Sequence, residues 1–536
     1  MSKQTGAQVL VAQLAARGVE RIFGVPGGDC SLDIIEAAKQ AGIAFVVART
    51  ENSAAMMAAA TAELTGSIGV VLTTRGPGLA NGVNGVAYAS LDRAPLVLIS
   101  DGYENDQAYI SHQRFDQGEV LRPLLKGALR LDAPTALPAV GALLDQALAD
   151  PPGPVYLEVT GAGMRGSVPA ASVPAQPDVP PLPAPTAAAL QAAGELLRRA
   201  SRPVVIAGLQ ARGEPAARAL RELAAQLRCP VFCTYKAKGI LPDADPLMTG
   251  YYIGGAAEDP LLREADLVIA YGADPIEFPP QPWRYDVPVL ELTTHPHPRH
   301  YFVPEVSVLG DVAQAARALR EGAGRSAWDG ERLARAKAHM RQCARATGDG
   351  PIDPQTAAEA AMAALPAGAR ITVDAGAHMM PILGAHQAGW PRDVLISRGL
   401  ATMAFALPAA LGAALADPAR PVVAFTGDGG LMMCASELAS AVQAGCKLTV
   451  VVFNDSDMAL IDVKQRRRKL PNAGVGYCAT DFAAVARGYG ARGWRCERPE
   501  QLAEAFAQAY ACDGPAVVDV VINPEAYHDQ IKALRG

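Results

Sequence analysis

The chain has 536 residues, and at about 150 residues per domain this length predicts three or four domains. Charged residues make up 19% and apolar residues 50%, a globular balance that excludes a disordered chain. The net charge of −6 shows no basic excess, so we expect neither a nucleic-acid nor an anionic-membrane partner. No apolar run reaches the roughly 18 to 20 residues that span a bilayer.

Cysteine usage and the N-terminus both indicate a cytoplasmic protein. The nine cysteines are scattered from Cys30 to Cys512 without a CxxC pair, which is typical of reduced thiols rather than of a disulfide framework or a zinc site. No apolar signal core follows residues 1–5, so secretion is not expected.

The first 165 residues alternate between short β-branched runs and Ala-rich stretches. Apolar strands separated by helices of this length predict a parallel sheet covered on both faces. The expected strands are 21–24, 44–48, 68–73 and 95–100, and the expected helices are 32–41, 53–64 and 79–90.

The same alternation occurs twice more along the chain. Seven prolines between Pro169 and Pro185 predict a semi-rigid linker over 166–187. A charged helix near 325–346 and the glycines around 348–351 mark a second boundary. We therefore expect an α/β fold of three doubly wound parallel-sheet domains. Their expected ranges are 1–165, 188–325 and 350–536.

One motif in the last domain carries chemistry. A buried strand over 421–426 leads into Gly427-Asp428-Gly429-Gly430, a glycine loop that opens a helix and so favours phosphate. Asp428 would repel a phosphate unless a divalent cation lay between them. Asp455 follows the next expected strand 27 residues later, an interval that fits one strand–helix–strand crossover. Two carboxylates at adjacent strand ends, with a backbone carbonyl and phosphate oxygens, would form an octahedral Mg²⁺ site.

Gly427-Asp428-Gly429 followed by Asn454-Asp455 resembles the thiamine diphosphate (ThDP) motif GDG–x–NN. Without a ligand, Gly-Asp-Gly could be an ordinary turn and Asn-Asp a helix cap. Further blocks, however, match across nearly the whole chain. Residues 23–28, 49–55, 76–81 and 402–410 resemble blocks of the acetolactate synthase and pyruvate oxidase/decarboxylase family.

The resemblance assigns a task to each domain. It implies that the N-terminal domain binds the cofactor pyrimidine, that the central domain is Rossmann-like and that the C-terminal domain binds the diphosphate and Mg²⁺. In this family each site is shared between subunits, so a homodimer is the minimum and a homotetramer the expected assembly.

Residue roles follow from the resemblance alone. Glu51 would hydrogen-bond pyrimidine N1′ and favour the imino tautomer, so that the cofactor's own amine removes the C2 proton. Met403, otherwise ordinary core filler, would enforce the bent cofactor conformation. Gln113 would enter the reaction centre. The implied cofactor-binding set is Pro26, Glu51, Gly76, Asn81, Ala377, His378, Ala401, Met403, Gly427, Asp428, Gly429, Gly430, Asp455, Met458 and Leu460, and the implied metal ligands are Asp428, Asp455 and Asp457.

The chain departs from the family pattern in places. Asp455 stands where most members have Asn, and catabolic acetolactate synthases resemble this chain in having Asp there. Thr50 replaces a His that is common in the family. Leu460-Ile461 resembles the apolar Met-Val pair of acetolactate synthases, and the glutamate expected of a decarboxylase is absent. Asp29 is a candidate catalytic acid, because decarboxylases carry an aspartate nearby.

The central domain carries weaker signals. FAD could be held there, as in some relatives, but Gly208–Gly213 is a poor match to a phosphate-binding pattern, so FAD is not favoured. Lys236 and Lys238 are expected to lie in a solvated loop rather than in a site.

The leading hypothesis is an acetolactate synthase-like enzyme that acts on small 2-oxo acids, by decarboxylation followed by carboligation of the resulting enamine. A 2-oxo-acid decarboxylase or a ThDP-dependent C–C lyase, whose enamine is protonated instead, stays open as an alternative. So does a ThDP-binding homologue without catalytic activity.

Overall fold

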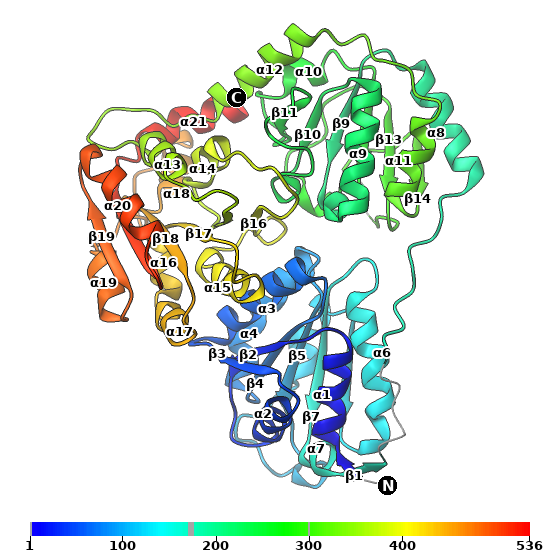
Figure 1. The fold of residues 1–536 in the computed structure, drawn as a ribbon, viewed down its shortest axis with the longest axis vertical. Coiled ribbons are helices and arrows are strands. Elements are labelled where there is room, and N and C mark those ends of the chain that lie inside the picture. The colour runs from blue at the N-terminus through cyan, green and yellow to red at the C-terminus, as the bar shows by residue number, and fades with distance from the viewer. Residues whose placement is uncertain (1–2, 170–175, 299–300) are drawn as a thin grey trace.

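The computed structural model describes residues 3–169, 176–298 and 301–536. Within these residues the chain forms three six-stranded parallel sheets and a short two-stranded antiparallel ribbon, β1 (Lys3–Thr5) with β8 (Ser167–Pro169). Helices flank each large sheet, which confirms the expected α/β class (Figure 1). Residues 170–175 of the expected linker lie outside the described residues, and residues 176–186 run along one edge of the molecule without helix or strand.

The N-terminal sheet has the strand order β3-β2-β4-β5-β7-β6. Its four inner strands are largely buried on both faces and are therefore nearly continuous apolar runs, whereas the two strands at its edges are partly exposed. The strands are β2 (Arg21–Val25), β3 (Ala44–Val47), β4 (Gly69–Thr73), β5 (Leu96–Asp101), β6 (Gly127–Leu131) and β7 (Pro154–Val159). The helices are α1 (Gly6–Ala16), α2 (Cys30–Gln40), α3 (Glu51–Thr65), α4 (Pro77–Leu91), α5 (Gln117–Leu121), α6 (Leu137–Leu148) and α7 (Gly161–Arg165), with 3₁₀ turns η1 (Asn105–Gln107), η2 (Arg122–Leu124) and η3 (Pro134–Ala136).

The central sheet has the order β11-β10-β9-β12-β13-β14, which is the 3-2-1-4-5-6 order of Rossmann folds. Its strands are β9 (Pro203–Ala207), β10 (Val231–Cys233), β11 (Met248–Tyr251), β12 (Leu267–Tyr271), β13 (Val289–Thr293) and β14 (Val306–Leu309). Its helices are α8 (Ala187–Arg199), α9 (Glu214–Leu227), α10 (Asp259–Leu262) and α11 (Val312–Arg320), with η4 (Leu209–Arg212), η5 (Tyr235–Ala237) and η6 (Pro275–Glu277). The charged helix α12 (Gly330–Cys343) leads to the last domain.

The C-terminal sheet has the order β16-β15-β17-β18-β20-β19. Its strands are β15 (Arg370–Val373), β16 (Val394–Ile396), β17 (Val422–Gly427), β18 (Leu448–Asn454), β19 (Arg492–Cys496) and β20 (Ala516–Val521). Its helices are α13 (Pro354–Ala363), α14 (Met379–Ala385), α15 (Ala406–Ala416), α16 (Asp428–Cys434), α17 (Glu437–Gln443), α18 (Ala459–Arg467), α19 (Phe482–Gly488), α20 (Leu502–Tyr510) and α21 (Ala526–Arg535), with η7 (Pro499–Gln501).

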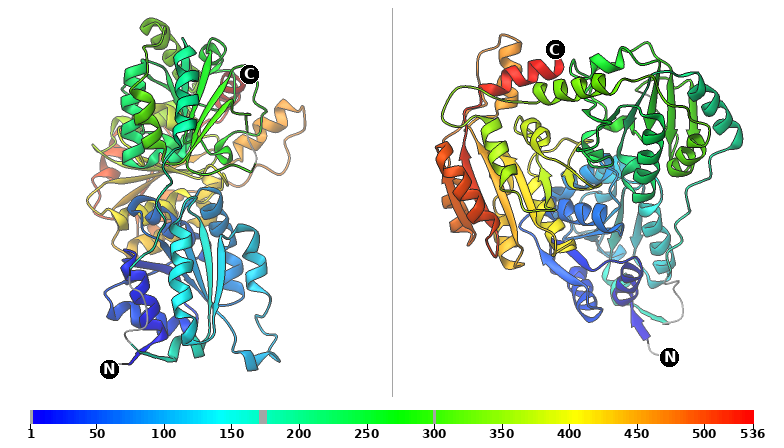
Figure 2. Two further views of the ribbon diagram at one scale, coloured as in Figure 1. Left: turned by 90° about the vertical axis from the view of Figure 1, so that its right-hand side faces the viewer. Right: turned by 45° about the horizontal axis from the view of Figure 1, so that its top comes forward.

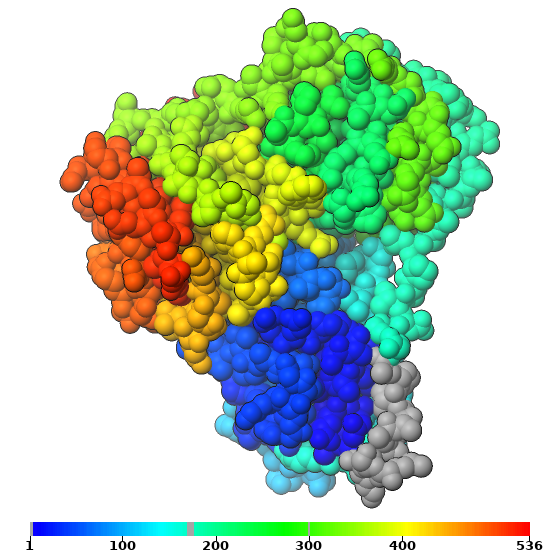
Figure 3. All heavy atoms as spheres, in the orientation of Figure 1, coloured from blue at the N-terminus to red at the C-terminus, as the bar shows by residue number. Residues whose placement is uncertain are grey.

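The domains pack into one body. Helix α15 is almost wholly buried because it packs against α3 of the N-terminal domain on one side and against its own sheet on the other. The side view places the central domain above the N-terminal one, with the C-terminal domain behind their junction (Figure 2). The space-filling view shows the N-terminal and C-terminal domains in contact on the face shown (Figure 3). No helix among the described residues is long and apolar enough to cross a membrane.

The expectation of a solvated loop at Lys236 and Lys238 is wrong. These side chains are only 1% and 2% exposed. Lys236 Nζ lies 2.9 Å from Glu63 Oε1 and 3.1 Å from Asp92 Oδ1, so it joins the central domain to two N-terminal carboxylates. Lys238 pairs with Asp243 at 2.6 Å. The sequence around the two lysines does not reveal their acidic partners. Without these partners, the free-energy cost of burying the two ammonium groups would be too high.

Candidate active site

The predicted pair of carboxylates meets at the carboxyl ends of neighbouring strands. Parallel strands β17 and β18 place Gly427 opposite Phe453, so Asp428 and Asp455 follow adjacent strand ends. Asp428 Oδ2 accepts the backbone N–H groups of Asp455 and Ser456, at 3.1 and 2.6 Å. The Tyr477 hydroxyl donates to Asp428 Oδ1 at 2.5 Å. The glycine loop and the next strand end thus form one connected surface.

Buried carboxyl groups gather on this surface. Burial, together with the charge of Asp428, raises the pKa of Asp455 to about 8, and burial also raises the pKa of Asp428. Asp457 Oδ1 is buried without a hydrogen-bond partner. Ionised carboxylates in this setting require a cation. Among the described residues no three His, Cys, Asp or Glu side chains gather as a self-sufficient metal cluster, so further ligands would have to come from backbone or bound phosphate.

The glycines leave no room for a side chain around the loop. A Cβ on Gly430 would lie 2.3 Å from Asp374 Oδ2, and one on Gly429 would lie 3.0 Å from the Tyr477 hydroxyl. Beside the loop, burial lowers the pKa of His378 to about 4, so its ring is neutral, and its Nε2 has no partner. A buried, unpartnered nitrogen beside close-packed glycines suits a polar ligand such as phosphate.

Met403 lies on a constrained segment. Ala401 and Ala404 on either side have φ of +52° and +63°, values that non-glycine residues seldom adopt. The buried carboxylate of Asp374 offsets this strain, because it accepts the N–H groups of Phe405 and Ala406 at 2.6 and 2.7 Å. Asp374 also accepts the Thr426 hydroxyl at 2.7 Å, which ties the Met403 segment to the strand before the glycine loop.

A cavity of about 370 Å³ opens over these groups. Helix α18 supplies one wall through Leu460 and Ile461, which are apolar. The predicted cofactor and metal residues that line it are Ala377, His378, Ala401, Met403, Gly427, Asp428, Gly429, Gly430, Asp455, Asp457, Met458 and Leu460. They are all the predicted site residues of the C-terminal domain.

The N-terminal candidates gather elsewhere, and none of them lines this cavity. Glu51 is the first residue of α3 and is buried, and its Oε2 accepts from Asn81 Nδ2 at 3.2 Å. Gly76 precedes α4 with φ of +68°, and Pro26 follows β2 as an exposed residue. On a single chain, the candidate residues of the N-terminal domain therefore lie apart from those of the C-terminal domain.

Glu51 is positioned by the other half of its own chain. Glu437 at the start of α17 is buried, and its Oε1 accepts the backbone N–H groups of Arg49 and Thr50, each at 3.0 Å. Thr50, which replaces the family's common His, caps α3 by accepting from Ser53 N at 3.2 Å.

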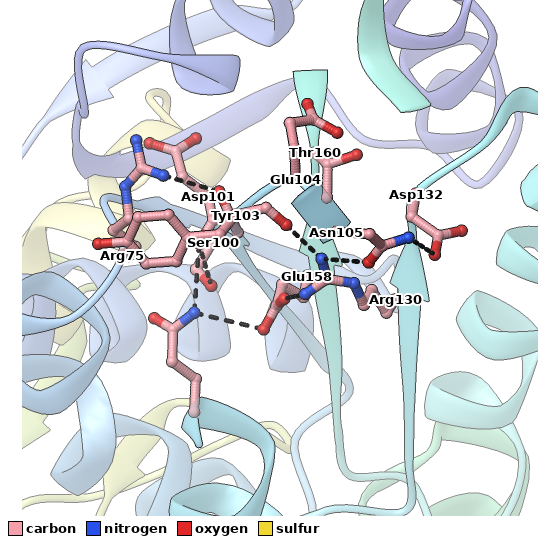
Figure 4. Close-up of polar contacts among 12 residues, drawn as sticks. Arg75, Ser100, Asp101, Tyr103, Glu104, Asn105, Arg130, Asp132, Glu158 and Thr160 are labelled. Atoms are coloured by element: carbon pink, nitrogen blue, oxygen red, sulfur yellow. Dashed lines mark hydrogen bonds and ion pairs between the residues drawn. The ribbon is translucent and has the colours of Figure 1, made fainter. Parts of the chain in front are cut away.

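Gln113 lies in an exposed turn with φ of +58°, packed closely against Gly76. The buried glutamine nearby is Gln117, whose Oε1 accepts from Gly76 N at 2.9 Å. A polar network lies in the same domain, where Arg130 donates hydrogen bonds to Glu158 and to the Tyr103 carbonyl (Figure 4). Gln113 is thus presented at the surface, open to a partner.

Asp29, the candidate catalytic acid, is held in ion pairs. Its carboxylate lies 3.1 Å from Arg75 Nη2 and 2.6 Å from Arg165 Nη2, and its side chain is 34% exposed. It is an ion-pair partner rather than an isolated acid in an apolar pocket.

Two backbone amides of the glycine turn at the central sheet already have protein acceptors. Leu209 N donates to Glu277 at 2.8 Å and Gln210 N to the Gly272 carbonyl at 3.0 Å. A Cβ on Gly208 would lie 2.4 Å from Ala273 Cα, so this glycine serves close packing between strand ends.

Sequence reasoning missed three residues of the site: Asp374, Glu437 and Tyr477. Asp374 directly follows the carboxyl end of β15, a position that could have suggested a site residue. Glu437 and Tyr477 carry no local signal, because their partners lie 387 and 49 residues away.

Comparisons with known proteins were made for the whole chain. Family models for thiamine pyrophosphate enzymes match residues 4–120 (N-terminal TPP binding domain), 190–319 (central domain) and 374–520 (C-terminal TPP binding domain). The chain is 29% identical to an acetolactate synthase of Bacillus subtilis, with 99% of the chain and 94% of the relative covered. It is 28% identical to a catabolic acetolactate synthase of Raoultella terrigena (97% and 95%) and 30% identical to a probable 2-ketoarginine decarboxylase of Pseudomonas aeruginosa (96% and 93%).

Proposed function

Because the chain belongs to the thiamine pyrophosphate enzyme family, we propose that it is a ThDP- and Mg²⁺-dependent, acetolactate synthase-like carboligase that acts on a 2-oxo acid. The observation that carries the proposal is the cavity itself, in which an acidic glycine loop adjoins an apolar wall. The relatives named as acetolactate synthases support the reaction class.

The residues present fit the cofactor and its metal. Asp428 and Asp455 would hold Mg²⁺ with a backbone oxygen, with Asp457 as a further candidate, and their buried negative charge is what such a cation would neutralise. The loop Gly427–Gly430 and the unpartnered His378 would contact the diphosphate. When bound, ThDP supplies a carbon nucleophile that attacks the 2-oxo carbonyl and accepts the electron pair released as CO₂ leaves.

The chain's own residues would activate and orient the bound cofactor. Glu51 would exchange a proton with the pyrimidine ring, and the hydrogen bond from Asn81 orients its carboxylate. Met403 would support the bent cofactor, and Asp374 fixes the backbone that presents it.

Ligation is favoured over protonation by the α18 wall. Leu460 and Ile461 present no acid to the reacting carbon, and Asp29 is paired with two arginines. With pyruvate, two molecules and one proton would then yield one acetolactate and one CO₂.

We further infer that each complete site is shared between two chains. Glu51 and Gln113 lie outside the cavity that Asp428 lines, and Gln113 is exposed on the single chain. A homodimer is thus the minimum and a homotetramer the expected assembly. The unpaired thiols of the described cysteines are compatible with a reducing cytoplasm.

Product analysis with pyruvate tests the reaction. Enzyme loaded with ThDP and Mg²⁺ should release CO₂ and give an acetolactate-to-acetaldehyde ratio above one. Predominant acetaldehyde would assign the chain to the decarboxylases, the candidate that the 30% identical decarboxylase relative favours.

A homologue without catalytic activity is the remaining alternative. It would bind ThDP in a circular-dichroism titration, yet release no CO₂ from any donor in a screen of 2-oxo acids. The same screen identifies the donor, which a few residues of the cavity wall decide.

A further inference from the structure

Side chains of both charges line the cavity. Its acids are Asp428, Asp455 and Asp457, and its cations are Arg398, Lys464 and Arg535, which we call the cationic rim. Lys464 lies four residues beyond Leu460 on α18, so it stands one helical turn further along the same wall, away from the acidic loop.

The rim has no carboxylate partners. Among the described residues none of its three side chains lies within ion-pair distance of an Asp or Glu. Arg466, another exposed cation of α18, is paired instead with Asp462 and Glu525. Unpaired positive charge on the lining of a cavity is a property that a ligand can use.

Arg398 is held ready for an anion. Its Nε donates to the Glu277 carbonyl at 2.7 Å, and its guanidinium lies 5.3 Å from the ring centroid of Tyr235. These contacts fix the plane of the guanidinium and leave its terminal nitrogens free for bidentate binding of an oxyanion.

Arg535 lies near the same tyrosine. Burial raises the pKa of Tyr235 to about 12, and the charges of both Arg398 and Arg535 oppose this rise. Tyr235 and both arginines line the cavity, with Arg398 bonded to Glu277 of the central domain and Arg535 on α21.

Resting on the proposed function, we propose that the substrate carries a second anionic group at the end remote from its reacting carbonyl, and that the cationic rim binds this group. A terminal carboxylate, sulfonate or phosphonate would satisfy the rim, with the carbon chain between carbonyl and anion lying along Leu460 and Ile461. A neutral aliphatic side chain would leave the partly buried Arg398 without an anionic partner and the exposed Lys464 and Arg535 to solvent alone.

A pair of donors of equal carbon number tests the proposal. CO₂ release from 2-oxoglutarate and 2-oxopentanoate is measured with the ThDP- and Mg²⁺-loaded enzyme, since these acids differ in a terminal carboxylate against a methyl group. We expect kcat/KM to favour the dianion at least tenfold. Sulfonate and phosphonate analogues of the same length identify which anion is preferred.

Substitutions at the three rim residues test whether the rim causes the preference for the dianionic donor. Arg398→Gln should lower the ratio of the two kcat/KM values at least tenfold, mainly through the KM of the dianion, and Arg398→Lys should restore part of it. Lys464→Gln and Arg535→Gln should each lower it several-fold. Lys469→Gln, a change to an exposed lysine outside the cavity lining, should leave the ratio unchanged. Equal use of both donors by the wild type, or a ratio that none of the rim variants changes, would overturn the proposal.

Equilibrium binding separates this inference from the proposed function. Calorimetric titration of the ThDP-loaded protein with glutarate and with pentanoate requires no turnover. If no 2-oxo acid releases CO₂, the proposed reaction fails, whereas tighter glutarate binding that Arg398→Gln abolishes would still establish the rim. Equal affinity for the two acids, with CO₂ release intact, would reject the rim alone.

Discussion

The N-terminal and C-terminal domains are the same fold used for different chemistry. Numbered within each domain, both sheets have the strand order 2-1-3-4-6-5. The N-terminal half-site offers one carboxylate, Glu51, with an amide beside it. The C-terminal half-site gathers three carboxylates, Asp428, Asp455 and Asp457, around a glycine loop. A shared topology fixes where ligands can approach, and the residues at the strand ends decide what approaches.

This difference predicts that substitutions in the two domains impair the enzyme in different ways. A change in the acidic C-terminal loop should prevent the cofactor from binding, because this loop is the proposed site of the metal and the diphosphate. A change at Glu51 should spare binding and slow the chemistry, because Glu51 is the residue proposed to exchange a proton with the cofactor.

Asp428→Ala should have the largest effect. Removing this carboxylate deletes a metal ligand and the acceptor of the Asp455 and Ser456 N–H groups, so cofactor binding should be lost. A circular-dichroism titration with ThDP and Mg²⁺ measures this. Asp513→Ala, at an exposed acid of the same domain, serves as control. Normal ThDP affinity in Asp428→Ala would remove this residue from the site.

Glu51→Gln should bind ThDP but lose turnover. The amide cannot exchange a proton with the pyrimidine, and a loss of this kind lowers rates by about 10² to 10⁴. Steady-state CO₂ release is compared with that of Glu36→Gln, a change to an exposed acid on α2. Near wild-type turnover of Glu51→Gln would contradict its role.

Lys236→Met should destabilise the contact between the central and N-terminal domains. The substitution leaves Asp92 and Glu63 buried with one fewer cation, and breaking a buried ion pair lowers the free energy of unfolding by about 3–5 kcal/mol. Urea denaturation measures the change, with Lys532→Met on exposed α21 as control. An unchanged transition would mean that the remaining partners satisfy these carboxylates, Arg212 for Glu63 and the backbone N–H groups of residues 398–400 for Asp92.

Ile461→Glu should shift the products toward aldehyde. An acid on the α18 wall can protonate the reacting carbon before a second carbonyl arrives, so the acetolactate-to-acetaldehyde ratio should fall about tenfold or more, the lower range of a general acid's effect. Leu470→Glu, beyond the end of the helix, is the matched control. An unaltered ratio would show that this wall does not face the reacting carbon.

Asp29→Ala should have the smallest effect on that ratio. Because Asp29 is paired with Arg75 and Arg165, its removal should leave the ratio unchanged or raise it. If the wild type gives mainly aldehyde and Asp29→Ala abolishes it, Asp29 is the proton donor and the chain is a decarboxylase.

Much of the fold was predictable from local patterns. The strands expected over 68–73 and 95–100 match β4 and β5 to within one residue at each end, because short apolar runs with flanking glycine or proline determine such elements. The 27-residue interval correctly predicted that Asp428 and Asp455 follow adjacent strand ends, because one crossover joins them.

The remainder depends on contacts distant in sequence. Lys236 reads as a loop cation until α3 and α4 bring Glu63 and Asp92 to it. Asp374 carries no motif, yet it fixes the segment of Met403 through backbone amides about 30 residues away. Charge type alone could not distinguish buried, paired side chains from solvated ones.

Subunit complementation tests the central claim most directly. Chains inactivated by Glu51→Gln and chains inactivated by Asp428→Ala are mixed under conditions of proven subunit exchange, and CO₂ release from the preferred 2-oxo acid is measured. If each site takes Glu51 from one chain and Asp428 from its partner, some mixed dimers contain a site that carries neither change, and activity returns. Proven exchange without recovery of activity would contradict the shared site.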